Sequence, residues 1–461
     1  MCQHTSFPAP ATTDSVPLMN HVLAFFQEVL LSLSQQQTAQ CKRGRPETLT
    51  VPHLLLACLL AVFRQTFAPS AVRRILLLEA VGSFAPLVAL TRQAVRQRLL
   101  ALGLHPFSHL LNEIQALLQE RGTPTSALSL AAFAPMVVAL DECKLDAVAR
   151  LCDEAAQRPK ESPYLLVGKL AALFDVRRQQ WVHIQFLSDA VGNGTVASLL
   201  LLEQLAKGSL ILADLGYFGF AWLQNLTAQG YYWISRLKST STYRITHTFY
   251  QDGETLDALI WLGTYRHDQY PDVVRLVQFR QGATLSRYVS NVLDPHLLPM
   301  ADLPRLYARR WDIELAFKLL KQALGLRMFW ACEPILVLQQ VLLTLTIAQV
   351  LHFFQLDIAA QAGVDPFEVS LDVLLKLLPQ ACWPCPYGLI QALISHSHCF
   401  SLIRPSRRLV LDVPDPPLDA LQPVPPGFQW HRPWKHTVRK KPRHPRTTDP
   451  WLFRFLPLLL L

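Results

Sequence analysis

Two short apolar runs, each followed at once by an aspartate, constrain the fold of this chain most strongly. Met136–Leu140 precedes Asp141, and Ser209–Ala213 precedes Asp214. One aspartate after a strand is usually a turn former or a helix cap, but two with the same pattern are more informative. If both runs are neighbouring strands of a mostly parallel sheet, the two carboxylates meet at the edge where such sheets bind ligands.

The segments around these runs predict an α/β domain. Residues 165–174 and 180–188 have the pattern of two strands joined by a turn, and 196–207 has helical periodicity. Residues 231–237 predict a further strand. Residues 239–296 contain short aromatic and β-branched runs broken by turns, which predicts a β-rich insertion without helices. The order strand, hairpin, helix, strand is typical of an α/β sheet.

The N-terminal part of the chain reads as helical. Apolar residues at helical spacing occur over His21–Ser34, Val51–Phe67, Ala71–Glu79, Arg92–Leu102 and Phe107–Arg121. Thr91 is expected to cap the helix that carries Arg92 and Arg96. These arginines lie on one side of that helix, as in a DNA recognition helix or on an ordinary solvated face. Upstream, Arg43–Pro46 is either a basic turn for a DNA minor groove or a linker.

Helices are expected again at Leu303–Leu324, Ile335–Phe354 and Leu371–Leu378. Ile335–Phe354 is apolar enough to cross a membrane, but glutamines and threonines interrupt it and no basic cluster flanks it. We therefore expect a buried helix and no membrane association. The first residues lack the pattern of a secretory signal, so a cytoplasmic location is expected.

Positive charge is concentrated near the end of the chain. The formal net charge is +9, but 432–446 is rich in lysine and arginine without an acid, and the remainder is close to neutral. Any nucleic-acid affinity of the main body must therefore come from local patches. The nine cysteines are scattered, as expected in a reducing cytosol, and Cys382–Cys385 has redox-type spacing without a strand–helix context.

One predicted helix gathers an unusual set of side chains on one side. At about 100° per residue, Tyr307, Arg310, Glu314 and Lys321 fall within about 60° of one another. Trp311 and Lys318 lie just beside this stripe. A carboxylate among cations suits a divalent metal beside a polyanion, arginine and lysine can bind phosphates, and an indole can stack on an unpaired base.

Tyr307-x2-Arg310-x3-Glu314-x6-Lys321 matches the Y-x2-R-x3-E-x6-K signature, and the chain resembles the bacterial insertion-sequence transposases of the DDE class. The resemblance covers roughly 135–355 and includes Asp214–Phe220 and Tyr288–Leu293. It implies a ribonuclease H-like core, with the β-rich insertion at about 239–296 preceding the acidic helix. It implies domains at 1–130 (helical, DNA-end binding), 131–355 (catalytic) and 356–461 (a helical segment and a basic, proline-rich tail).

The resemblance also implies a chemistry. Asp141, Asp214 and Glu314 would be the catalytic, metal-binding triad, with two Mg²⁺ ions or Mn²⁺ as a substitute. The DNA-contacting residues would be Tyr307, Arg310, Trp311, Lys318 and Lys321, with Arg92 and Arg96 in the end-binding region. The partners would be double-stranded DNA, namely terminal inverted repeats and a target, and a second copy of the chain in a synaptic complex associated with the nucleoid.

The sequence departs from the family pattern in two places. Glu142 and Cys143 follow the first aspartate where a small or hydroxyl residue is common, which leaves Asp146 as an alternative to Asp141. Leu215 stands where a basic residue is frequent.

The main alternative to a cut-and-paste transposase is a related metal-dependent nuclease or resolvase. A second is a non-catalytic, domesticated DNA-binding protein.

Overall fold

The structure of the chain is a computed structural model. The structure describes residues 50–65, 69–76, 91–120, 131–145, 169–187, 194–264, 269–326, 329–331, 333–377, 386–405 and 413–432. The chain divides into two compact units. The first comprises residues 1–118, 323–325 and 342–405, and the second comprises 119–322, 326–341 and 406–461.

Several sequence predictions lie outside the described residues. They concern the helix at 21–34, the basic turn at 43–46, the alternative ligand Asp146, the cysteine pair at 382–385 and the tail beyond residue 432.

The described part of the first unit is helical. Its helices are α2 (Val51–Phe63), α3 (Pro69–Leu76), α5 (Arg92–Leu102), α6 (His105–Glu120), the second half of α14 (Pro334–Ala362), α15 (Leu371–Leu377), α16 (Pro386–Ser395) and α17 (Ser397–Phe400), with a 3-10 turn η3 (Pro366–Glu368). Helix α5 begins and ends as predicted, and the Thr91 hydroxyl accepts a hydrogen bond from the amide of Ala94, 3.1 Å away. This bond satisfies one of the amides that a helix start leaves unpaired.

Helix α14 is long and apolar enough to span a membrane by length and composition. However, 89% of its most apolar 18-residue window is buried inside the protein. Its glutamines and threonines at positions 339, 340, 344, 346 and 349 are all fully buried. This agrees with the prediction of a core helix, because buried polar side chains in such a helix point toward protein partners.

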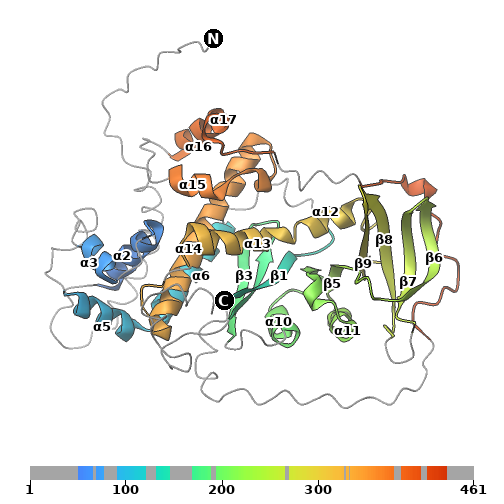
Figure 1. The fold of residues 1–461 in the computed structure, drawn as a ribbon, viewed down its shortest axis with the longest axis horizontal. Coiled ribbons are helices and arrows are strands. Elements are labelled where there is room, and N and C mark those ends of the chain that lie inside the picture. Colours follow the sequence, from blue (N-terminus) through green and yellow to red (C-terminus); the bar gives the residue numbers. More distant parts are fainter. Residues whose placement is uncertain are drawn as a thin grey trace, which may run out of the picture. The chain divides into compact units, whose positions relative to one another are not determined.

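The second unit contains a mixed sheet of nine strands, in the order β3-β2-β1-β4-β5-β9-β8-β7-β6 (Figure 1). The strands are β1 (Val137–Lys144), β2 (Lys169–Asp175), β3 (Gln180–Leu187), β4 (Leu210–Ala213), β5 (Tyr232–Arg236), β6 (Tyr243–Asp252), β7 (Thr255–Leu262), β8 (Val273–Gln281) and β9 (Thr284–Ser290). Strand β1 pairs antiparallel with β2 and parallel with β4, and β4 pairs parallel with β5. The predicted neighbour relation of the two aspartate-bearing strands is therefore confirmed.

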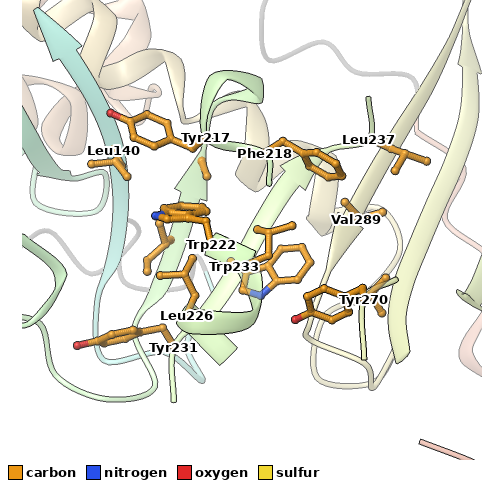
Figure 2. Close-up of a cluster of buried hydrophobic side chains, with 14 of the residues drawn as sticks. Leu140, Tyr217, Phe218, Trp222, Leu226, Tyr231, Trp233, Leu237, Tyr270 and Val289 are labelled. Atoms are coloured by element: carbon orange, nitrogen blue, oxygen red, sulfur yellow. The ribbon is translucent and has the colours of Figure 1, made fainter. Parts of the chain in front are cut away.

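Helices cover both faces of the first half of this sheet (Figure 1). Helices α10 (Gly194–Leu202) and α11 (Phe220–Ala228) pack on one face, where Val138 and Leu140 of β1 join a core that includes Trp222 and Trp233 (Figure 2). Helix α13 (Trp311–Lys318) packs on β1 and β2. Its Phe317 contacts Trp181 at 5.0 Å between ring centroids. Side chains alternate along a strand, so Asp141 belongs to the α13 face and Glu142 to the α10 face.

The strands predicted within 239–296 are present, and they extend the same sheet. Strand β9 pairs antiparallel with β5, so β6 to β9 continue the row of strands. Residues 413–432, which contain the short 3-10 turn η4 (Leu418–Ala420), pack across this half. Leu421, Val424 and Phe428 cover a small core that contains Phe249 and Trp261. This described part of the proline-rich segment is thus docked on the sheet.

Candidate catalytic carboxylate site

The register of the sheet brings Asp141 and Asp214 side by side. The parallel ladder between β1 and β4 ends at the pair Leu140–Ala213, so the next residue of each strand is an aspartate. Asp214 follows the end of β4, as predicted, and its carboxylate accepts a hydrogen bond from the amide of Gly216 in the 3-10 turn η1 (Leu215–Tyr217).

The placement of Asp141 at a strand end was wrong. Strand β1 continues to Lys144 because β2 pairs with it on its other side, as far as the pair Lys144–Lys169. Asp141 therefore lies within a strand whose partner on the β4 side has already ended. Its backbone is held by β2, while its side chain is half-buried on the face of the sheet that α13 covers.

The prediction of one continuous helix over 303–324 was also wrong. The segment divides into α12 (Asp302–Ala308), α13, and a π-helical turn over Leu319–Ala323. Between α12 and α13 the amides of Arg309, Arg310 and Asp312 bond to carbonyls three residues earlier, which tightens the turn. The angular stripe calculated for a regular helix therefore does not describe Lys321, which lies in the wider π turn.

Arg310 joins the helix glutamate to a strand aspartate. One terminal guanidinium nitrogen is 2.6 Å from Oε1 of Glu314, and Nε is 3.6 Å from Oδ1 of Asp214. The arginine side chain is 6% exposed, whereas those of Glu314 and Asp214 are 31% and 43% exposed. Because α13 packs on β1, this brings all three predicted carboxylates to one place on the sheet.

The three carboxylates act on one another electrostatically. Burial raises the pKa of Asp141 to about 6. The amide of Glu142, which donates to Oδ1 at 2.8 Å, and the charge of Arg310 lower this pKa, while Glu314 and Asp214 raise it. Three carboxylates near one guanidinium, which is paired with only two of them, form a set of hard oxygen donors with excess negative charge. Such a donor set fits Mg²⁺ or Mn²⁺.

Aromatic rings surround Arg310. Its guanidinium lies 5.9 Å from the ring centre of Tyr307 and 5.0 Å from that of Trp311. Tyr307 is buried against Tyr288, and burial raises its pKa to about 12, so its hydroxyl stays protonated. Trp311 is 44% exposed, which suits the predicted stacking on an unpaired base.

The predicted lysines occupy different positions. Lys318 is exposed at the end of α13. Lys321 is half-buried beside Cys143, which points to the same face as Asp141. Burial raises the pKa of that thiol, and the charge of Lys321 opposes the change. The arginines Arg92 and Arg96 lie in the other compact unit, on α5, where Arg92 is exposed and Arg96 half-buried.

The sequence analysis missed Arg236, the last residue of β5 and a cation near Tyr288 and Tyr307. The ladder of β4 and β5 ends at Leu212–Ile234, so the register carries Arg236 to the level of Asp214. Arg236 is exposed, and its charge lowers the pKa of Tyr288 and Tyr307. Applying the strand-end argument to the third parallel strand would have found this residue.

Residues 152–350 match the family model described as the transposase DDE domain. The match supports a DNA transposase function. The matched range includes Asp214 and Glu314 and begins after Asp141. No curated protein matches the sequence. Among solved structures, the chain is similar to the piggyBac transposase in its cryo-EM synaptic complex with hairpin DNA, with 10% sequence identity, a TM-score of 0.38, and 83% of each chain covered.

Proposed function

We propose that this DNA transposase cleaves DNA at the ends of its own insertion sequence and joins the freed 3′ end to a target. The observation that supports this function most directly is that three carboxylates lie around Arg310. Two parallel strands and one helix bring them there, and they belong to Asp141, Asp214 and Glu314. The strand order β3-β2-β1-β4-β5, followed by the glutamate on α13, supports the finer proposal of a ribonuclease H-like core.

The three carboxylates would hold Mg²⁺, or Mn²⁺ in its place. When bound, such ions activate the attacking oxygen and stabilise the leaving oxygen of an in-line displacement at phosphorus. The chain itself supplies the donors in fixed positions: Asp141 from within a strand held by β2, Asp214 from a capped turn, and Glu314 from a helix packed on β1. Arg310 neutralises these charges and keeps the donors together while no metal is present.

The cations and aromatic rings around the carboxylates would bind the DNA end. Arg236, Lys318 and Lys321 would contact phosphates, and the exposed ring of Trp311 would stack on a base. Arg310 would reach a phosphate only by releasing its carboxylates. Arg92 and Arg96 would contribute in the end-binding region.

The substrate we propose is double-stranded DNA, namely the terminal inverted repeats of the element and a target duplex. Two ends must be held together for cut-and-paste transposition, so we propose a homodimer on DNA, acting in the cytoplasm at the nucleoid. We also propose that the chain belongs to the Y-x2-R-x3-E-x6-K group of transposases. Its domains would be 1–130, 131–355 and 356–461.

The test is a Mg²⁺-dependent cleavage and joining assay, with oligonucleotides taken from the inverted repeats that flank the gene. We expect Asp141→Asn, Asp214→Asn and Glu314→Gln to abolish cleavage and to leave binding of the same DNA largely intact. Cleavage that survives in a variant would remove that residue from the triad. Cutting of branched DNA without joining of 3′ ends would favour a nuclease or resolvase instead.

A further inference from the structure

A second polar cluster lies on the face of the sheet opposite Asp141. The ammonium of Lys169 is 2.7 Å from Oε2 of Glu142, and the lysine side chain is only 4% exposed. Around them this face is apolar, with Leu140 on β1 and Leu173 on β2 in the core. Lysine is almost never this buried unless it is paired with an acid, so the contact with Glu142 accounts for the buried position of Lys169.

Two further polar atoms of this cluster remain unmatched. Oε1 of Glu142 and the hydroxyl of Tyr217 are both buried, and neither has a hydrogen-bond partner within the described part of the chain. Burial raises the pKa of Tyr217, and the charges of Glu142 and Asp141 and the approach of the hydroxyl to the Glu142 carboxylate raise it further, so the phenol remains a donor. Figure 2 shows its ring extending from the turn after β4 toward β1, beside Leu140.

The backbone of α10 confines the same carboxylate from another side. A Cβ atom added at Gly194, the first residue of this helix, would overlap Oε1 of Glu142. Only glycine therefore leaves room for the carboxylate in its observed position. The ion pair with Lys169 and the contact with Gly194 together fix where the unmatched oxygen points.

The cluster joins the two segments that carry the strand aspartates. Glu142 directly follows Asp141, and Tyr217 belongs to the turn that Asp214 caps, where its amide donates to the Asp214 carbonyl at 3.0 Å. The ladder between β1 and β4 ends one residue before both aspartates. A side-chain link at this point would continue the connection that the backbone ladder no longer provides.

We propose that the Tyr217 hydroxyl donates a hydrogen bond to Glu142 and that this bond fixes the separation of Asp141 and Asp214. Glu142 and Tyr217 are then positioning residues for the metal site, and Lys169 holds Glu142 in place. This inference rests on the proposed function, since the separation of the carboxylates matters only if they share a metal. Loss of such an outer partner typically weakens metal binding by about 10- to 100-fold.

The central variant is Tyr217→Phe, and the matched control is Tyr231→Phe. Tyr231 is buried in the same core, but its hydroxyl donates to the carbonyl of Leu202 at 2.6 Å, away from the carboxylates (Figure 2). Mn²⁺ binding to the full chain without DNA is measured by electron paramagnetic resonance, alongside the thermal midpoint and the kcat and KM of cleavage. We expect Tyr217→Phe to weaken Mn²⁺ binding about 10-fold and to lower kcat at unchanged KM.

We expect Tyr231→Phe to keep the Mn²⁺ affinity of the wild type, even where it lowers the thermal midpoint as much. A second arm removes the buried charges together, by Glu142→Leu with Lys169→Met. In that background Tyr217→Phe should cause no further loss of Mn²⁺ affinity, because the acceptor is already gone.

Equal Mn²⁺ affinities of the Tyr217→Phe and Tyr231→Phe variants would overturn the inference. Asp214→Asn is measured in parallel to separate the two proposals. If Asp214→Asn loses Mn²⁺ binding and cleavage while Tyr217→Phe keeps both, only the positioning role fails. If Asp214→Asn also keeps both, the proposed function itself fails.

Discussion

Two arginine–carboxylate groups on the same sheet differ in how completely they are paired. In the β-rich half, Arg275 contacts Asp257 through two hydrogen bonds of 2.8 and 2.5 Å and donates a third to the carbonyl of Leu298, and both side chains are 0% exposed. In the other half, Nε of Arg310 has no hydrogen-bond partner in the described structure, and its two carboxylates are partly exposed. The fully paired Arg275–Asp257 ion pair has a structural role. The carboxylates around Arg310 are only partly paired, so they keep oxygen atoms that can bind a cation.

The largest effect on stability is expected at the structural pair. Arg275→Ala leaves Asp257 buried without its partner, which should lower the free energy of unfolding by about 3–5 kcal/mol. Urea denaturation measures this loss. The control is Arg280→Ala on the same strand, whose pair with Glu254 is exposed to solvent and should contribute far less to stability. Similar losses in both variants would show that the pairing of Arg275 is not special.

The pH dependence of unfolding distinguishes the carboxylate site next. The folded state raises the pKa of Asp141 from 3.8 to about 6, so it binds more protons than the unfolded state between these values. Stability from this group is present below about pH 4 and is lost as the pH rises through about 6. We expect the metal-free wild type to lose up to about 3 kcal/mol relative to Asp141→Asn over this window. Parallel stability curves would contradict the shift.

Arg310→Ala should have opposite effects on the affinity for a metal ion and on the rate of DNA cleavage. Its partners are partly exposed and can be hydrated, so the expected loss of stability is about 1 kcal/mol, well below that of Arg275→Ala. Because Arg310 competes with a cation for the carboxylates, the variant should bind Mn²⁺ more tightly in calorimetry and yet cleave DNA more slowly. Weaker Mn²⁺ binding would mean that Arg310 organises the donors more than it competes for them.

The smallest expected effect is at Arg236. Removal of one phosphate contact by Arg236→Ala should weaken DNA binding by about 1 kcal/mol and reduce the salt dependence of binding by about one counterion. Fluorescence anisotropy at several salt concentrations measures both. Arg305→Ala, an exposed arginine of α12 paired with Asp302, is the control and should leave the salt slope unchanged.

Local sequence patterns predicted which helices and strands form better than they predicted where each one begins and ends. The runs before Asp141 and Asp214 indicated neighbouring strands, and Thr91 indicated the start of α5, because both signals are local. The extension of β1 beyond Asp141 depends on its antiparallel partner, which no local pattern records. The continuation of the sheet through β9 is likewise a long-range pairing.

The predicted helical stripe grouped side chains that do lie close together, but it did not describe how they are arranged in space. It grouped Arg310 with Glu314, which the structure joins at 2.6 Å, but an angle around a helix axis says nothing about depth. Arg310 was expected as a ready phosphate ligand and is instead buried on the carboxylates. The tight turn before α13 and the π turn after it depart from the period of 3.6 residues, so a search for that period could not show them.

The most direct test of the carboxylate site is a Mn²⁺ titration of the full chain by electron paramagnetic resonance, with Asp141→Asn, Asp214→Asn and Glu314→Gln compared with the wild type. We predict saturable Mn²⁺ binding by the wild type and a loss of affinity of at least about 10-fold in each variant. Unchanged binding in all three variants would contradict the proposal that these carboxylates hold the catalytic metal.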